Sequence, residues 1–298
     1  MVLEQLEMGS DADRFVRQLY DWNQYAAAYS AAEGRYRGAI QVTEEMEIIL
    51  LAMLAERRWD LITATRRRVV DALSLFPTEM ANRFLEAASL AEVFSIIDEI
   101  ETAEEFFLSW KELFTRSTRT NIVNNAELEQ IRVPDSVVGW TCANVLKRLT
   151  VEDHQQAILR SFLKDADRTV CWRIVHVMGA FPGEANAEQL FAVFDSDSYH
   201  WIRYGAIRSL VEIAALANAR LRSKIFSKLA NNIDKLASDE RILDEFERVI
   251  FIDKARAPRH WTRDVNRVLK ALLNQTPHVE GRAHWERLAY RLYQEYES

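Results

Sequence analysis

Histidine and cysteine are the residues of this sequence that most readily bind metals or act as nucleophiles. None of the six histidines belongs to an H-E-x-x-H motif or to an i, i+4 pair, the spacing that places two imidazoles on one helix face for zinc. Cys142 and Cys171 form no C-x-x-C pair, and we interpret both as packing residues. The motifs of serine hydrolases and protein kinases do not occur either. We therefore expect no catalytic residue, no metal site and no cofactor, and a protein that is not an enzyme.

The strongest local charge feature is an acidic segment within a stretch that has no Lys or Arg between Arg83 and Lys111. Its six acids form the acidic patch: Glu92, Asp98, Glu99, Glu101, Glu104 and Glu105. Such a field would speed association with a basic protein partner. A solvated face, with acids favoured near a helix start at Thr102, is the alternative interpretation.

Basic residues gather at residues 254–270, together with His260 and Trp261. Four of them form the basic patch: Arg259, Arg263, Arg267 and Lys270. The last three share one face of a predicted helix, and an interleaved tryptophan suits phosphate contact with stacking. The net charge of −7 and pI near 5.5 argue against a nucleic-acid surface. An exposed basic face, or a patch that meets an acidic protein, is the interpretation we favour, with nucleic-acid binding as the alternative.

The composition indicates a chain built almost wholly from helices. Eight glycines and five prolines in 298 residues are too few for the turns of an all-β sandwich, and no glycine-rich phosphate loop is present. Apolar residues repeat at three and four in nearly every window, and capping-box patterns predict helix starts at Thr102, Thr150 and Asn186. An acidic N-terminus and the lack of an apolar run of about 18 residues predict a cytoplasmic protein with no membrane segment.

Internal repetition at a period of 32 residues is the most informative pattern. Four columns of apolar residues keep this step: Val138, Val170 and Ile202; Ala143, Val175 and Ile207; Leu146, Met178 and Leu210; Leu149, Phe181 and Ile213. A fainter copy aligns residues 67–77 with 172–182 and pairs Val70 with Val175. Asp13-Arg14 also matches Asp167-Arg168, which suggests that the first helix begins in the same way. The pattern predicts stacked helix pairs, clearest at residues 134–215 and out of step by position 234.

Residues 162–181 and 195–213 share most of one pattern: an Asp-x-Asp turn, a Val-Arg pair, small residues on one helical face and Leu-Gly at the end of the helix. The matching residues are Asp165, Asp167, Val170 and Gly179 in the first copy, and Asp197, Ile202, Arg203, Ala206 and Leu210 in the second. These segments resemble HEAT-type repeats of the short kind first described in phycobilisome lyases, although Cys171 stands at the family's arginine position and Val211 at its glycine. We interpret Asp165, Asp197 and Arg203 as structural. Periodicity and resemblance together predict an all-α, right-handed α-solenoid of HEAT-like helix pairs, as one continuous domain over residues 1–298.

A solenoid offers a long surface and carries no chemistry of its own. We therefore expect a non-catalytic module that binds a protein partner: an adaptor, a scaffold, or an inhibitor or immunity-type protein. Its acidic surface would suit a basic partner. The expected contact residues are Tyr199, His200, Trp201, His154, Gln155, Glu188 and Gln189. Because HEAT-like DNA glycosylases and bilin lyases also exist, the alternative is a nucleic-acid-binding protein or a DNA glycosylase-like enzyme of the same architecture.

Overall fold

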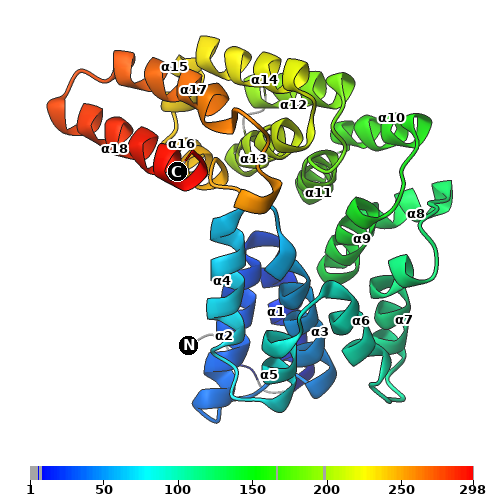
Figure 1. The fold of residues 1–298 in the computed structure, drawn as a ribbon. Helices are drawn as coiled ribbons and strands as arrows, with labels where there is room; N and C mark the ends of the chain where they lie inside the picture. The colour runs from blue at the N-terminus through cyan, green and yellow to red at the C-terminus, as the bar shows by residue number, and fades with distance from the viewer. Residues whose placement is uncertain (1–5, 7–8, 166, 197–198, 298) are drawn as a thin grey trace. The chain divides into compact units, whose positions relative to one another are not determined.

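The computed structural model describes residue 6 and residues 9–165, 167–196 and 199–297 (Figure 1). Eighteen α-helices account for most of these residues, which contain no β-strand and only two isolated bridges, Ile62 with Ile252 and Ile122 with Thr150. The predicted all-α class is confirmed. The chain divides into two compact units: unit 1 holds residues 1–60 and 65–159, and unit 2 holds residues 61–64 and 160–298. A single continuous domain stays a prediction.

Unit 1 is built from the first ten helices. They are α1 (Gly9–Trp22), α2 (Gln24–Tyr36), α3 (Glu44–Glu56), α4 (Thr63–Leu73), α5 (Glu79–Glu86), α6 (Leu90–Asp98), α7 (Glu105–Phe114), α8 (Asn125–Glu129), α9 (Ser136–Arg148) and α10 (Asp153–Ser161). The first residues of α4 and the last of α10 belong to unit 2. Short 3₁₀ turns at residues 57–59, 116–118 and 130–132 extend some of these helices.

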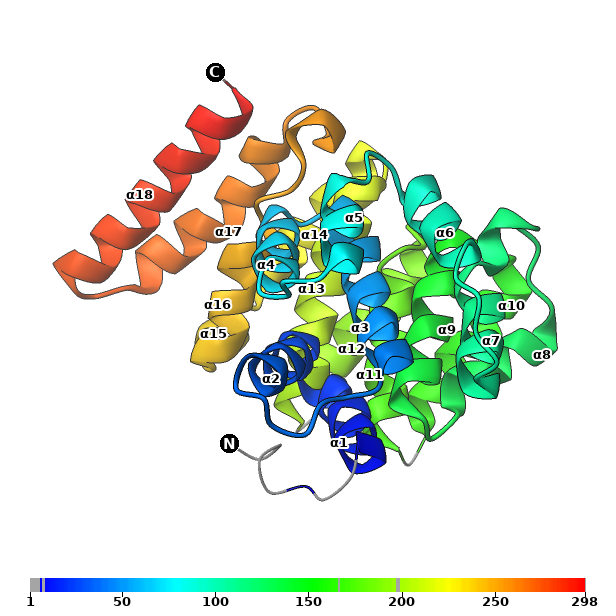
Figure 2. The same cartoon turned by 90° about the horizontal axis from the view of Figure 1, so that it is seen from below.

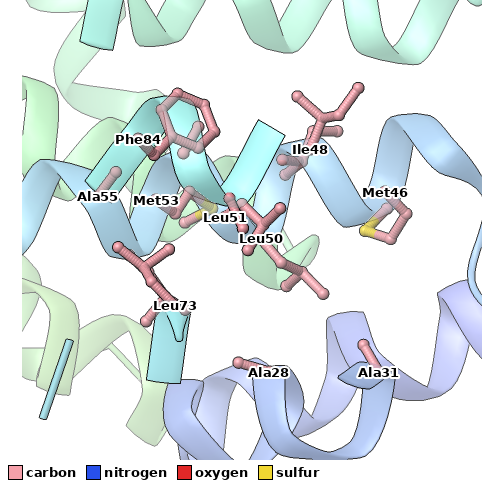
Figure 3. Close-up of a cluster of buried hydrophobic side chains, with 14 of the residues drawn as sticks. Ala28, Ala31, Met46, Ile48, Leu50, Leu51, Met53, Ala55, Leu73 and Phe84 are labelled. Atoms are coloured by element: carbon pink, nitrogen blue, oxygen red, sulfur yellow. The ribbon is translucent and has the colours of Figure 1, made fainter. Parts of the chain in front are cut away.

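The core of unit 1 surrounds α3. Every residue from Met46 to Ala55 is buried, and all of them except Glu47 are apolar, so this helix contacts α2, α5, α6 and α7. Figure 3 shows its leucines and methionines beside the small residues Ala28 and Ala31 of α2 and the ring of Phe84 of α5. Burial of each leucine contributes about 1.5–3 kcal/mol to the stability of this unit.

Helix α1 contacts both its neighbour α2 and the distant helix α9. The Asp21 carboxylate accepts hydrogen bonds from Trp140 Nε1 at 3.0 Å and from the Ser136 hydroxyl, and Arg17 pairs with Asp135. Trp140 lies 119 residues after Asp21 in the sequence. In a simple row of repeats each helix pair contacts only the next one. Unit 1 therefore departs from simple stacking by closing its first helix onto its ninth.

Unit 2 is a row of stacked helix pairs. In sequence order its helices are α11 (Arg168–Met178), α12 (Glu184–Ser196), α13 (His200–Leu216), α14 (Ala219–Asn231), the short α15 (Ile233–Ala237), α16 (Glu240–Val249), α17 (Trp261–Gln275) and α18 (Val279–Tyr296). Helix α12 packs on α13, and α14 packs on α13 and α17. Helices α11, α13 and α16 pack in one row, and α14, α17 and α18 pack in a second. This is the stacking that a solenoid requires, and the predicted solenoid class is confirmed in this unit.

The 32-residue period corresponds to the positions of the helices. Helices α9, α11 and α13 begin at Ser136, Arg168 and His200, which are 32 residues apart. The apolar columns are buried except for Val138 and Phe181, which are half-buried. The step ends where the sequence indicates, because α16 begins at residue 240 instead of residue 232.

Several predicted details of helix starts are wrong. Helix α7 is capped by Glu104 instead of Thr102, and α10 begins at Asp153, beyond Thr150. Asn186 lies inside α12, where it is buried and accepts a hydrogen bond from Arg160 at 2.6 Å. A capping box does occur at the start of α8, where Asn124 pairs with Glu127, and it is not among the predicted helix starts.

The two faint copies also differ from their templates. Val70 is 42% exposed although it was paired with the fully buried Val175, and its neighbour Val69 is buried instead. Asp167 caps α11, whereas Asp13 lies inside α1 and accepts two hydrogen bonds of 2.8 Å from the amide and hydroxyl of Thr43. Similar sequences therefore make different contacts in the two copies.

Candidate functional site

Five aromatic side chains form a continuous cluster on α11 and at the start of α13 in unit 2. We call it the aromatic row: Trp172, Tyr199, His200, Trp201 and Tyr204. The indoles of Trp172 on α11 and Trp201 on α13 are stacked, with ring centroids 5.8 Å apart and planes inclined by 26°. Trp201 meets Tyr204 edge-on at 5.7 Å and His200 at 4.9 Å. Each of the five is half-buried, so packing fixes its ring while part of its surface stays accessible.

Arginines stand at both ends of the aromatic row. The guanidinium carbon of Arg168, at the start of α11, lies 6.0 Å from the centroid of the Tyr199 ring. That of Arg248, on α16, lies 6.0 Å from the centroid of the Tyr204 ring. The aromatic row and its two arginines thus extend over α11, α13 and α16, which pack one against the next. Rigid aromatic rings flanked by arginine are the combination most enriched at the centres of protein interfaces.

A buried polar network holds Tyr204, at one end of the aromatic row, in place. The Tyr204 hydroxyl is hydrogen-bonded to the carboxyl group of Glu245, and burial raises the pKa of this tyrosine above its usual range. Glu245 is 1% exposed, and burial also raises its pKa, with the charge of Arg208 acting in the opposite direction. Arg208 Nη1 lies 3.8 Å from Glu245 Oε1, and its Nε lies 2.9 Å from Glu212 Oε1. The network links α13 to α16 and keeps the row in one arrangement.

The sequence predicts only part of the aromatic row. Tyr199, His200 and Trp201 were expected to be exposed contacts, and they are half-buried against Trp172 and Tyr204, which were not predicted as site residues. A signal for the missed pair exists, because Tyr204 follows Trp172 by the same 32 residues that separate Trp172 from Trp140.

The four other predicted contact residues lie apart from the row. His154 is exposed on α10, beside Glu152, with its Nδ1 3.2 Å from Glu152 Oε2. Gln155 is 5% exposed, and its amide nitrogen donates to Val123 O at 2.8 Å, so its place in the interior does not fit a contact with a partner. Glu188 is exposed on α12 and accepts a hydrogen bond from Lys224 of α14 at 3.2 Å; Gln189 is half-buried beside it.

The acidic patch is exposed and partly engaged. All six carboxylates are at the surface: Glu92, Asp98, Glu99, Glu101, Glu104 and Glu105. Arg83 pairs with Glu99, Lys111 donates to the carbonyls of Asp98 and Ile100, and Glu92 and Glu104 accept backbone amides at helix starts. Within the described residues, no ion pair or hydrogen bond occupies the carboxylates of Asp98, Glu101 and Glu105. The role of the acidic patch in binding a basic partner stays a prediction.

The basic patch is divided by the structure. Arg263, Arg267 and Lys270 lie on one face of α17 and line a hollow between α17 and α18, whereas Arg259 is exposed before the helix and does not line it. Arg267 is half-buried and donates to the Ser227 hydroxyl at 3.0 Å and to that of Ser223. Three of the four predicted cations thus share one site.

The residues interpreted as structural make structural contacts. Asp165 accepts the Asp167 amide at 2.9 Å, and Arg203 donates to the carbonyl of Phe194 at 3.3 Å; Asp197 lies outside the described residues. Cys142 and Cys171 are both buried. In the part of the chain that the structure describes, no three His, Cys, Asp or Glu side chains are grouped as a metal ion would require. None of the described helices has the length and apolar character needed to cross a bilayer.

Comparison with known proteins yields likenesses to solved structures. No family model matches the chain, and no curated protein matches it. Among solved structures, a designed armadillo repeat protein is similar over 70% of this chain and 96% of its own, with 14% sequence identity and a TM-score of 0.35.

Proposed function

We propose that this protein is a non-catalytic helical scaffold of HEAT-like pairs that binds another protein through the aromatic row of unit 2. The observation that supports it is the stacking of Trp172 on Trp201, continued by Tyr204, across successive helices and flanked by Arg168 and Arg248. Because the rings are already fixed by packing, a partner would order few side chains on binding them. We place this function in the cytoplasm.

The partner that we propose carries a basic surface. The chain has a net charge of −7, and the carboxylates of Asp98, Glu101 and Glu105 are exposed. Opposite charge on the partner would raise the rate of association and make it depend on salt. An adaptor, or an inhibitor of a basic protein, is the role that this combination supports best.

The test uses two tryptophan variants, one inside and one outside the aromatic row, in affinity capture from native host extract. Trp201→Ala removes the centre of the aromatic row, and Trp22→Ala removes a tryptophan of unit 1 that is 55% exposed and lies outside the row. We expect the wild type and Trp22→Ala to retain the same proteins and Trp201→Ala to lose at least one of them. Circular dichroism of each variant checks that it is folded. Equal capture by all three folded proteins would exclude the aromatic row as the binding surface.

A further inference from the structure

A hollow of about 510 Å³ lies between α17 and α18, away from the aromatic row and sharing no residue with it. Helices α17 and α18 run side by side, as Figure 2 shows. Arg263, Arg267 and Lys270 of α17 line the hollow, and Tyr293 and Glu297, near the end of α18, line it from the other side. This volume is sufficient for a small ligand.

The hollow carries an excess of positive charge. The buried carboxylate of Asp264 lies beside it and pairs with Arg222, whose Nε is 2.8 Å from Asp264 Oδ2. Arg267 and Arg263 approach the other oxygen of Asp264 only to 3.6 and 3.8 Å. Since Arg222 already balances Asp264, the charges of Arg263, Arg267 and Lys270 are offset by Glu297 alone among the described lining residues. Two positive charges therefore remain, on a chain that is acidic as a whole.

Unpartnered polar groups line the same hollow. Thr262 is 4% exposed, and its hydroxyl has no hydrogen-bond partner; the side-chain oxygen of Asn266 also has none. Leaving such a group unpaired costs about 1–3 kcal/mol, so it calls for an explanation. Threonine in a helix has two accessible χ1 rotamers, and rotation can turn the hydroxyl of Thr262 towards a ligand in the hollow.

The start of α17 adds to the preference for an anion. His260, the N-cap residue, has φ = 67° and ψ = 22° and makes no side-chain cap to the first turn. No capping side chain therefore accepts the first amides of α17, and the buried Asp264 in the same turn offsets part of the helix dipole. A left-handed histidine is an uncommon conformation that often occurs near functional sites.

We propose that the hollow between α17 and α18 binds the phosphate group of a small phosphorylated molecule that also carries hydroxyl groups. The phosphate accepts from Arg263 and Lys270, and from the Thr262 hydroxyl once that buried side chain has rotated towards the hollow. The buried oxygen of Asn266 accepts from a ligand hydroxyl after the same kind of rotation. The cations converge on one hollow instead of following an extended track. This arrangement favours a small molecule over the backbone of a nucleic acid.

Calorimetric titration of the full-length chain with inorganic phosphate, pyrophosphate and ribose 5-phosphate tests the proposal. We expect saturable binding of ribose 5-phosphate that weakens by about tenfold or more when Arg263→Gln and Lys270→Gln are combined. Arg267 is left intact because its contacts with serines of α14 serve the fold. Arg282→Gln, at an exposed arginine of α18 that does not line the hollow, is the matched control and should bind as the wild type does.

Thr262→Val separates a ligand role from a purely structural one. Valine has nearly the same shape and removes the unpartnered hydroxyl, so the variant should be at least as stable as the wild type while it binds ribose 5-phosphate several-fold more weakly. Unchanged affinity in this variant, or equal affinity in the wild type and the double variant, would overturn the proposal. An oligothymidylate that binds more than tenfold tighter than ribose 5-phosphate, and is lost in the double variant, would overturn the assignment to a small molecule. Because no residue of the aromatic row is altered, capture of the protein partner should remain, and the two proposals can fail separately.

Discussion

Gly179 offers a sharp test of how closely the helices of unit 2 stack. It lies at the end of α11, where α13 passes, and a Cβ placed there would be 2.4 Å from Glu212 Oε2, 2.9 Å from Ser209 Oγ and 3.1 Å from Ser209 Cα. The backbone of Gly179 is right-handed helical, with φ = −58° and ψ = −25°. Alanine can adopt this conformation without strain, so Gly179→Ala probes only the approach of the two helices.

The cost of this substitution follows from how firmly the two neighbours are held. Glu212 is 4% exposed and bonded to Arg208 at 2.9 Å, and the Ser209 hydroxyl donates to Val175 O at 2.8 Å. Neither group can retreat without weakening a buried hydrogen bond, and the Cα of Ser209 is part of the backbone. Overpacking of this kind costs about 1–3 kcal/mol, while alanine returns about 0.4–1 kcal/mol by restricting the unfolded chain. We expect a net loss of about 1–2 kcal/mol in the free energy of unfolding.

Urea denaturation followed by circular dichroism measures the loss, and hydrogen exchange of peptides from α11 and α13 locates it. Gly183→Ala is the control, because the nearest heavy atom to its Cβ would be 3.9 Å away and its φ is not positive. Gly183 directly precedes α12, where glycine is favoured over alanine, so that variant should change stability by less than about 1 kcal/mol in either direction. The close stacking of α11 on α13 would be refuted if Gly179→Ala were as stable as Gly183→Ala.

Three further substitutions test buried polar contacts. Glu245→Gln should raise stability at neutral pH and make stability less dependent on pH. Because the pKa of Glu245 is raised in the folded state, the stability of the wild type falls as pH rises from the ordinary glutamate pKa through the folded one. Denaturation at several pH values measures the difference. Thr141→Val should cost about 1–3 kcal/mol in urea denaturation, because the buried Trp110 Nε1, now 3.0 Å from the threonine hydroxyl, loses its acceptor. Arg222→Met should cost up to about 3–5 kcal/mol in the same assay, because the fully buried Asp264 carboxylate keeps only its longer contacts with Arg263 and Arg267. Adding Asp264→Leu should restore most of that stability.

The regular part of unit 2 could be predicted from the sequence because every repeat buries the same positions. Met178 and Leu210 are both buried, and they lie on α11 and α13, which begin 32 residues apart. Apolar side chains report such a period directly, since each must face the neighbouring pair. Helix caps follow a weaker rule, because a polar side chain such as that of Asn186 can serve a tertiary contact as readily as a helix end.

The sites were only partly predictable, since each joins residues whose proximity depends on packing. Spacing within α17 places Arg263, Arg267 and Lys270 on one face, and that prediction needs only the helical period. No comparable rule places Tyr293 of α18 opposite them, or stacks Trp172 on Trp201, which is 29 residues away. The same limit explains Gln155, whose burial results from its contact with Val123.

The loss of the period after α14 bears directly on where chemistry can arise. Within the period, each position must fit the next pair, and polar groups there are largely satisfied, as Ser209 is by Val175 O. Beyond it, α17 packs between α14 and α18, and three features that depart from ordinary packing gather on or beside it: the left-handed His260, the unpartnered Thr262 hydroxyl and the buried Asp264 surrounded by arginines. Local rules that are broken together at one place are characteristic of functional sites in a fold that is otherwise consistent. The irregular end of unit 2 is therefore where ligand binding should be sought first, and the regular pairs are where a partner protein would find a rigid surface.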